Sequence, residues 1–200
     1  IEAEWKLTPV SKIRSLIDGD LDGSAYPVEG QAVTWIDRTD ARIGVVGRPE
    51  ERASANAWSA FESALAITID SAEHVDVAIH RSGLGTAARA AHTVITAAPG
   101  SRGTVILRST GSATLSENVE IVVGDGAELT VVSLQEWDDD ALHLASHFAT
   151  VGRDAKLKHI VVSLGGEVVR VNPSVHLDGN HAECELYGLY FADAGQHLEQ

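Results

Sequence analysis

A strand-like segment preceded by a tight turn returns along the chain at a nearly constant interval, and this interval limits the fold more than any other feature. The run "GDGAELTVVSLQEW" at residues 124–137 is followed by "GRDAKLKHIVVSLGGE" and, more weakly, by "DGNHAECELYGLYF". Ala127, Ala155 and Ala182 lie 28 and 27 residues apart, each after a turn that contains Gly or Asp. A fixed period of this size is typical of a solenoid, in which each coil places the same side chain over its predecessor.

The residues around the three alanines support the same alignment. Leu129, Leu157 and Cys184 each follow an alanine by two positions and are therefore predicted to point inward. Phe148 and Val175 both fall seven residues before the next alanine, which suggests a second set of equivalent positions. We predict that the alanines of successive coils stack at about one strand spacing, roughly 5 Å.

Short β-type runs follow one another after residue 66. The predicted strands are 67–70, 75–80, 92–96, 104–108, 117–123, 128–134, 147–151, 156–164, 168–171 and 182–191. Only residues 84–92 and 137–147 could hold a helix between them, and both stretches are short. We therefore predict a mainly β protein, with a right-handed parallel β-helix (a single-stranded solenoid) over residues 67–200. An antiparallel sandwich with coincidental self-similarity is the alternative, and it requires 128–134 to pair antiparallel with 156–164.

Residues 1–66 are predicted to form a small mixed α/β region before the solenoid. Thr8 as N-cap and Pro9 at the first helical position begin a short amphipathic helix that ends near Gly19. The other elements expected here are strands at 32–36 and 43–46 and one helix over roughly 53–66.

Composition excludes several classes of partner. The formal net charge is -14, from 29 acidic and 15 basic residues, so the surface repels nucleic acids and anionic membranes. The single cysteine, Cys184, cannot form an internal disulfide, and this indicates a reducing cytoplasm. No run approaches the roughly 18 apolar residues of a membrane span, and no signal peptide opens the sequence.

Two features of the sequence are those that a piece of a longer polypeptide is expected to have. The sequence contains no methionine, and it stops soon after an apolar strand-like run without a capping helix. The β-helix is therefore expected to be truncated at its C-terminal end. Because an uncapped solenoid exposes apolar interior, residues 187–191 are expected to lie against another copy or another segment, which leaves self-association open.

Residues 109–200 resemble the core of the SufB/SufD family of iron–sulfur cluster assembly proteins, and within it the SufD branch more closely. Residues 5–16, "WKLTPVSKIRSL", resemble an element that precedes this core. The resemblance implies a parallel β-helix that pairs with a SufB-like β-helix, the two being carried by a SufC-like ATPase. A cysteine desulfurase would supply sulfur to the complex indirectly.

The resemblance implies a non-catalytic scaffold subunit. ATPase activity would belong to the partner, and the iron–sulfur cluster would form transiently in the full complex, with no cofactor bound by residues 1–200. A Cys/Ser-x-His segment and SufC-contacting helices of the SufD branch are not found within these residues.

Two residues match a motif of the family. Gln135 and Trp137 correspond to a Gln-x-Trp motif that lies along a proposed sulfur route in the SufB branch. Both have the same parity in a strand and are predicted to be polar residues of the interior, either functional or a satisfied structural pair. The lysine that this branch has after the next Phe-x-Thr stretch is replaced by Val151, and its sulfur-accepting cysteines are not recognisable.

Other candidate sites have simpler interpretations. His143 and His147 would share a helix face as in zinc proteases, but the glutamate is missing and they are expected to be exposed or in a turn. Cys184 is expected to be a small core residue, and Asp138 to Asp140 a solvated loop. We therefore predict no catalytic and no metal-binding residues.

Two other functions remain alternatives. Parallel β-helices also occur in polysaccharide-active enzymes, which use clustered acids or bases in an exposed groove. A purely structural solenoid would likewise explain the repeats.

Overall fold

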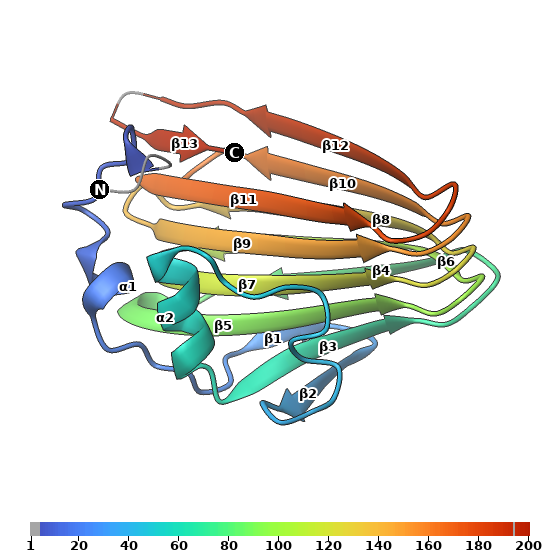
Figure 1. Ribbon diagram of the computed structural model, residues 1–200. Helices are drawn as coiled ribbons and strands as arrows, with labels where there is room; N and C mark the ends of the chain where they lie inside the picture. The colour runs from blue at the N-terminus through green and yellow to red at the C-terminus, as the bar shows by residue number, and fades with distance from the viewer. Residues whose placement is uncertain (1–4, 194) are drawn as a thin grey trace.

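Two β-sheets lie face to face in the computed structural model, which describes residues 5–193 and 195–200 (Figure 1). Sheet A has seven strands in the order β13-β11-β9-β7-β5-β3-β2, and sheet B has six in the order β1-β4-β6-β8-β10-β12. Each coil of the chain contributes one strand to each sheet. The prediction of a parallel β-helix is therefore confirmed.

The elements have the following bounds. The strands of sheet A are β2 (Val33–Asp37), β3 (Ser63–Ile69), β5 (Gly85–Ala97), β7 (Ala113–Val123), β9 (Leu142–Val151), β11 (Val168–Leu177) and β13 (His197–Glu199). The strands of sheet B are β1 (Val28–Gly30), β4 (Val75–Arg81), β6 (Arg102–Gly111), β8 (Glu128–Trp137), β10 (Lys156–Ser163) and β12 (Glu183–Tyr190). The helices are α1 (Arg14–Asp18) and α2 (Arg52–Ala60). Strands β1 and β2 pair antiparallel with β4 and β3, whereas all later pairs are parallel.

The register of the predicted repeat is also confirmed. Leu157 pairs with Leu129 on one side and with Cys184 on the other. The alanines stack with them, because the amide of Lys156 donates to the Ala127 carbonyl at 2.8 Å and that of Glu183 donates to the Ala155 carbonyl at 2.9 Å. Antiparallel pairing of these segments, which the sandwich requires, is contradicted.

One part of the alignment is wrong. Val175 pairs with Ala149, and Phe148 pairs with Ser174. Val175 consequently packs on the core, whereas Phe148 has the parity of the outer face. The cause is the connection between β11 and β12, which is one residue longer than the connection between β9 and β10.

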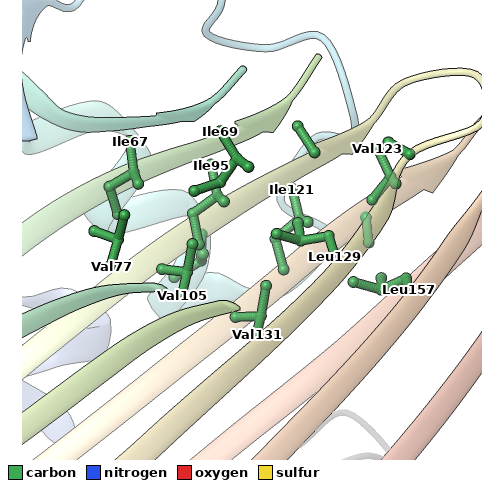
Figure 2. Close-up of a cluster of buried hydrophobic side chains, with 14 of the residues drawn as sticks. Ile67, Ile69, Val77, Ile95, Val105, Ile121, Val123, Leu129, Val131 and Leu157 are labelled. Carbon is green, nitrogen blue, oxygen red and sulfur yellow. The ribbon is translucent and has the colours of Figure 1, made fainter. Parts of the chain in front are cut away.

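Alternate residues of the coils fill the space between the sheets. Figure 2 shows Ile67, Ile95 and Ile121 of sheet A in one row, opposite a row that contains Val105 and Val131 of sheet B. All five side chains are at most 1% exposed. Branched residues suit this layer because they pack closely on a pleated surface. Each such side chain contributes about 1.5–3 kcal/mol by leaving water.

The N-terminal region departs from prediction in three places. Helix α1 begins only at Arg14, because residues 10–12 form a turn and no side chain caps the helix. Helix α2 ends at Ala60, and residues 63–66, which were expected to be helical, form the first part of β3 instead. Residues 43–46 are turns rather than a strand, with Gly44 at a φ of 78° that a strand does not allow. The strand predicted at 32–36 corresponds to β2.

Helix α2 and the loop before it cover the outer face of sheet A through polar side chains of β7. Ser116 donates to the Ala53 carbonyl at 2.9 Å, and the Asn118 amide donates to the Ser54 carbonyl at 3.0 Å. The Glu120 carboxylate accepts the amides of residues 44–46 at 2.8–3.2 Å. These contacts hold the N-terminal region against three successive outward positions of one strand.

The stacked position of Leu157 gives a test of the fold. Leu157→Ala removes a side chain that is 1% exposed between Leu129 and Cys184, so it should lower the free energy of unfolding by about 2–5 kcal/mol. Ile160→Ala, on the outer face of the same strand, should cost clearly less. Urea unfolding followed by circular dichroism measures both, and equal losses would contradict the inward assignment of Leu157.

Candidate functional site in the solenoid interior

A column of polar side chains runs through the interior on sheet B. The register pairs Arg81 with Ser109, Ser109 with Gln135, and Gln135 with Ser163, so four successive coils place a polar group at the same point. All four residues are at most 3% exposed. The repeat therefore stacks polar groups as regularly as it stacks apolar ones.

Gln135 and Trp137 point inward, as their parity predicts, and hydrogen-bond to each other. The Trp137 indole N–H donates to Gln135 Oε1 at 2.7 Å, and Gln135 Nε2 donates to Ser133 Oγ at 2.6 Å. Trp137 also approaches Nδ1 of His143 at 3.3 Å. The polar atoms of both residues thus have partners inside the solenoid, as buried polar groups require.

The same network contains a fully buried ion pair. The Arg81 guanidinium donates two hydrogen bonds to the Glu117 carboxylate at 2.6 and 2.8 Å, and it also contacts Ser109 Oγ at 3.0 Å. Burial alone would raise the pKa of Glu117, but the charge of Arg81 and the hydrogen bonds from His143 and Arg81 hold this pKa well below its usual range. Removing one partner of such a pair typically costs about 3–5 kcal/mol, because it leaves a charge buried without compensation.

His143 connects this ion pair to Trp137. Its Nε2 lies 2.8 Å from Glu117 Oε1. Burial lowers the pKa of His143 despite the nearby carboxylate, so the ring is neutral near pH 7. A neutral ring that donates from Nε2 to Glu117 leaves Nδ1 to accept from Trp137, and the hydrogen bonds therefore fix one tautomer.

The prediction made from the sequence for His143 and His147 is wrong. His143 and His147 were expected to be exposed or in a turn, but they are 0% and 2% exposed. The two residues lie on β9, and positions four apart share a face in a strand as well as in a helix. Their spacing therefore reflects a common inward direction.

His147 forms a second interior contact with His159 of β10. Nδ1 of His147 lies 2.8 Å from Nε2 of His159, and among the described residues Nε2 of His147 has no hydrogen-bond partner. Burial, with a contribution from His159, lowers the pKa of His147 to about 3, and burial lowers that of His159 to about 4. Both rings are thus neutral at pH 7. His159 also lines a pocket of about 300 Å³ with Tyr190 and Gln200.

The remaining candidates lie apart from this network. Cys184 is half-buried at the inward position of β12, and burial followed by the charge of Glu185 raises the pKa of its thiol. Asp138 to Asp140 are exposed, as expected of a solvated loop. Within residues 5–193 and 195–200, no group of three or more His, Cys, Asp or Glu could hold a metal ion. Neither described helix is long and apolar enough to span a membrane.

Four interior polar residues were not singled out in the sequence: Arg81, Ser109 and Glu117 of the network, and His159 of the second contact. Glu117 has the same parity as Val119, Ile121 and Val123, so a charge at an inward position was the available signal. Arg81 had no such signal, because it follows the predicted end of its strand at residue 80.

The buried histidines predict a loss of stability in mild acid. They are protonated in the unfolded chain below about pH 6.5 but stay neutral in the folded one down to about pH 4, so the unfolded state binds more protons in between. The contribution of each neutral histidine to stability should therefore be present in full above about pH 6.5. As the pH is lowered, the free energy of unfolding should fall by roughly 1–2 kcal/mol per histidine between pH 7 and 5.

Urea unfolding at several pH values measures this effect. The double variant His147→Gln/His159→Gln should show a flatter dependence between pH 7 and 5, with a remainder from His143. His181→Gln is the matched control, because the His181 side chain is 85% exposed. An unchanged slope in the double variant would refute the neutral interior pair.

Comparison with known proteins adds a family to this geometry. The model of the SUF system FeS cluster assembly SufBD core domain matches residues 79–200. An iron–sulfur cluster assembly SufBD family protein of Mycobacterium leprae is 38% identical over 98% of this chain and 52% of its own length. One from Mycobacterium tuberculosis strain H37Rv is 39% identical over 98% of this chain and 51% of its own length.

A second SufBD family protein of Mycobacterium leprae is 31% identical over only 81 residues, 40% of this chain and 9% of that protein. No solved structure matches the chain. The chain spans about half the length of the curated relatives that match it throughout. Because the core-domain match covers more than half of its residues, the chain belongs to the SufBD family of the SUF system for iron–sulfur cluster assembly.

Proposed function

We propose that this chain is part of a non-catalytic scaffold subunit, of the SufD type, in a cytoplasmic SufBCD-like complex. It would pair with a SufB-like β-helix and a SufC-like ATPase, and the cluster would form transiently between subunits from sulfur supplied through a cysteine desulfurase. The observation that carries the proposal is the SufBD core match over residues 79–200, on a solenoid whose single thiol is poorly suited to chemistry.

The thiol argues for a scaffold rather than a sulfur carrier. Persulfide transfer needs a thiolate, and the reactive cysteines of proteins have lowered pKa values and an electropositive environment. Cys184 has a raised pKa and lies next to Glu185, so thiolate is disfavoured at pH 7. The interior network contains guanidinium, carboxylate, amide, hydroxyl, imidazole and indole groups, and Cys184, which lies outside it, is the one cysteine of the sequence.

Two observations support assignment of this chain to the SufD branch of the family. This chain matches one Mycobacterium leprae SufBD protein over nearly its whole length but another over 81 residues only. Val151, at the place where the SufB branch has a lysine, is fully buried at an inward position of β9. An uncharged side chain there is consistent with a structural interior.

Partner binding is the direct test of the proposal. We expect the protein, expressed together with the SufB-like and SufC-like proteins of its own organism, to co-purify with both at a fixed ratio. A strain that lacks the gene should lose activity of its iron–sulfur enzymes and regain it with the wild-type copy. A folded protein that binds neither partner, or that cleaves polysaccharides, would contradict the scaffold function.

The role of Cys184 gives a second test. Cys184→Ala should leave complementation largely intact and cost about 1 kcal/mol or so of stability, because a half-buried thiol loses little contact area. The readout is iron–sulfur enzyme activity in the strain that lacks the gene. Loss of this activity with a stably folded variant would place sulfur chemistry in this chain.

A further inference from the structure

The residues before α1 contact the part of the chain that forms β11 and β13 (Figure 1). The Thr8 hydroxyl donates to Glu199 Oε2 at 2.8 Å, although the two residues lie 191 positions apart. Lys12 Nζ forms an ion pair with Glu167, just before β11, at 2.7 Å. A segment that precedes the first coil therefore lies against the last one that the structure describes.

Trp5 is the main anchor of this contact. The residue is buried, and its ring centroid lies 4.5 Å from Cζ of Arg170 on β11. Arg170 Nε in turn donates to Glu199 Oε1 at 3.2 Å. A guanidinium over an indole ring is attracted to it, and more strongly where water is excluded, as it is around the buried Arg170. Trp5 therefore helps to stabilise a charge that β11 buries.

An apolar cluster joins the same segment to three strands of sheet A. Ile13 and Leu16 are fully buried, and they pack with Leu144 of β9 and Val168 of β11. Ala88 of β5 packs against the same cluster. Burial of such side chains is the largest favourable contribution that a contact of this kind makes. The segment is thus held by a buried apolar cluster as well as by its polar contacts.

The other end of the segment is fixed to α2. Asn56 Nδ2 donates to the carbonyls of Leu16 at 3.1 Å and Gly19 at 2.9 Å. Helix α2 itself packs on β5, β7 and part of β9. We call residues 5–19 the strap, because one end is held by α2 and the other by β11 and β13.

The strap adds a connection that the repeat itself does not provide. In a solenoid each coil contacts its neighbours, so coils can unfold one after another. The strap and α2 link the coil of β5 and β6 to the coil of β11 and β12, and the coils of β7–β8 and β9–β10 lie between them. The coil of β11 and β12 can therefore separate from the others only when the contacts of the strap are broken as well.

We propose that the strap couples the coil of β11 and β12 to the first coils, so that these coils unfold together rather than one at a time. The strap precedes its docking site on residues 167–199 in the chain. It therefore docks only after the coil of β11 and β12 has formed, and its docking completes the cooperative unit. Release of the strap would leave that coil held by its neighbour in the solenoid alone.

Two probes of unfolding test this coupling. Cys184 lies on β12 and is half-buried, so its reaction with a maleimide becomes faster when the coil of β11 and β12 opens. Labelling of Cys184 across a urea series, read by mass spectrometry, reports on that coil, and circular dichroism reports on the whole β-structure. The variants Trp5→Ala and Thr8→Val are made in the full-length protein. Leu7→Ala is the matched control, because Leu7 is 82% exposed in the same segment.

We expect the two midpoints to coincide in the wild type and in Leu7→Ala. In Trp5→Ala the labelling midpoint should fall below the dichroism midpoint by at least about 0.5 M urea, because opening one coil exposes less surface and its midpoint shifts further for the same loss of stability. Thr8→Val should show a smaller separation in the same direction, and it decides the test if Trp5→Ala does not fold. Coincident midpoints in the folded variants would make the strap an ordinary stabilising contact and would overturn the proposal, as would separated midpoints in the wild type.

Discussion

The in-register stacking of parallel strands is the constraint on which the rest of this structure depends. A slip of one residue would turn every inward side chain outward, so each coil must bring its strands back to the same parity. Leu115 pairs with His143, and His143 pairs with Val169, at separations of 28 and 26 residues. The connections absorb this difference in length while the register within the strands is preserved. Turn length, rather than a strict sequence period, is therefore the variable that the fold adjusts.

Stacking also explains why the interior holds a connected polar network rather than isolated polar residues. Arg81 and Glu117 are 36 residues apart, yet the coils place their charged groups 2.6 Å from each other. A buried charge needs a partner, and the partner in turn needs donors for its other oxygen, which Arg81 and His143 provide. The bonds then continue through Trp137 and Gln135 to Ser133. A change at one residue of this network would leave another without a partner, so its members are coupled energetically.

Much of the solenoid could be predicted from the sequence, because parity within a strand is a local property. Gln135 and Trp137 were placed inside by parity alone. The N-terminal region was harder, because Leu65 and Ala66 are compatible with a helix and become a strand by pairing with β5, about 28 residues away. The same limit applies to the candidate site. Arg81, Glu117 and His159 have their role only through contacts between coils, and no local spacing indicates which residues will meet.

The interior of the solenoid and the outer faces of its two sheets differ in how their polar and apolar side chains are covered. The network of Gln135, Trp137 and His143 is at most 4% exposed and is held by short internal hydrogen bonds, so it forms a filled interior rather than an open channel. Movement of a ligand through it would require these bonds to break and the Trp137 ring to leave its place. Helix α2 covers the outer face of sheet A at β5, β7 and part of β9. Both described helices pack on sheet A, so the outer face of sheet B has no helical cover. This filled interior supports the scaffold role proposed above over a role in which sulfur passes through the solenoid.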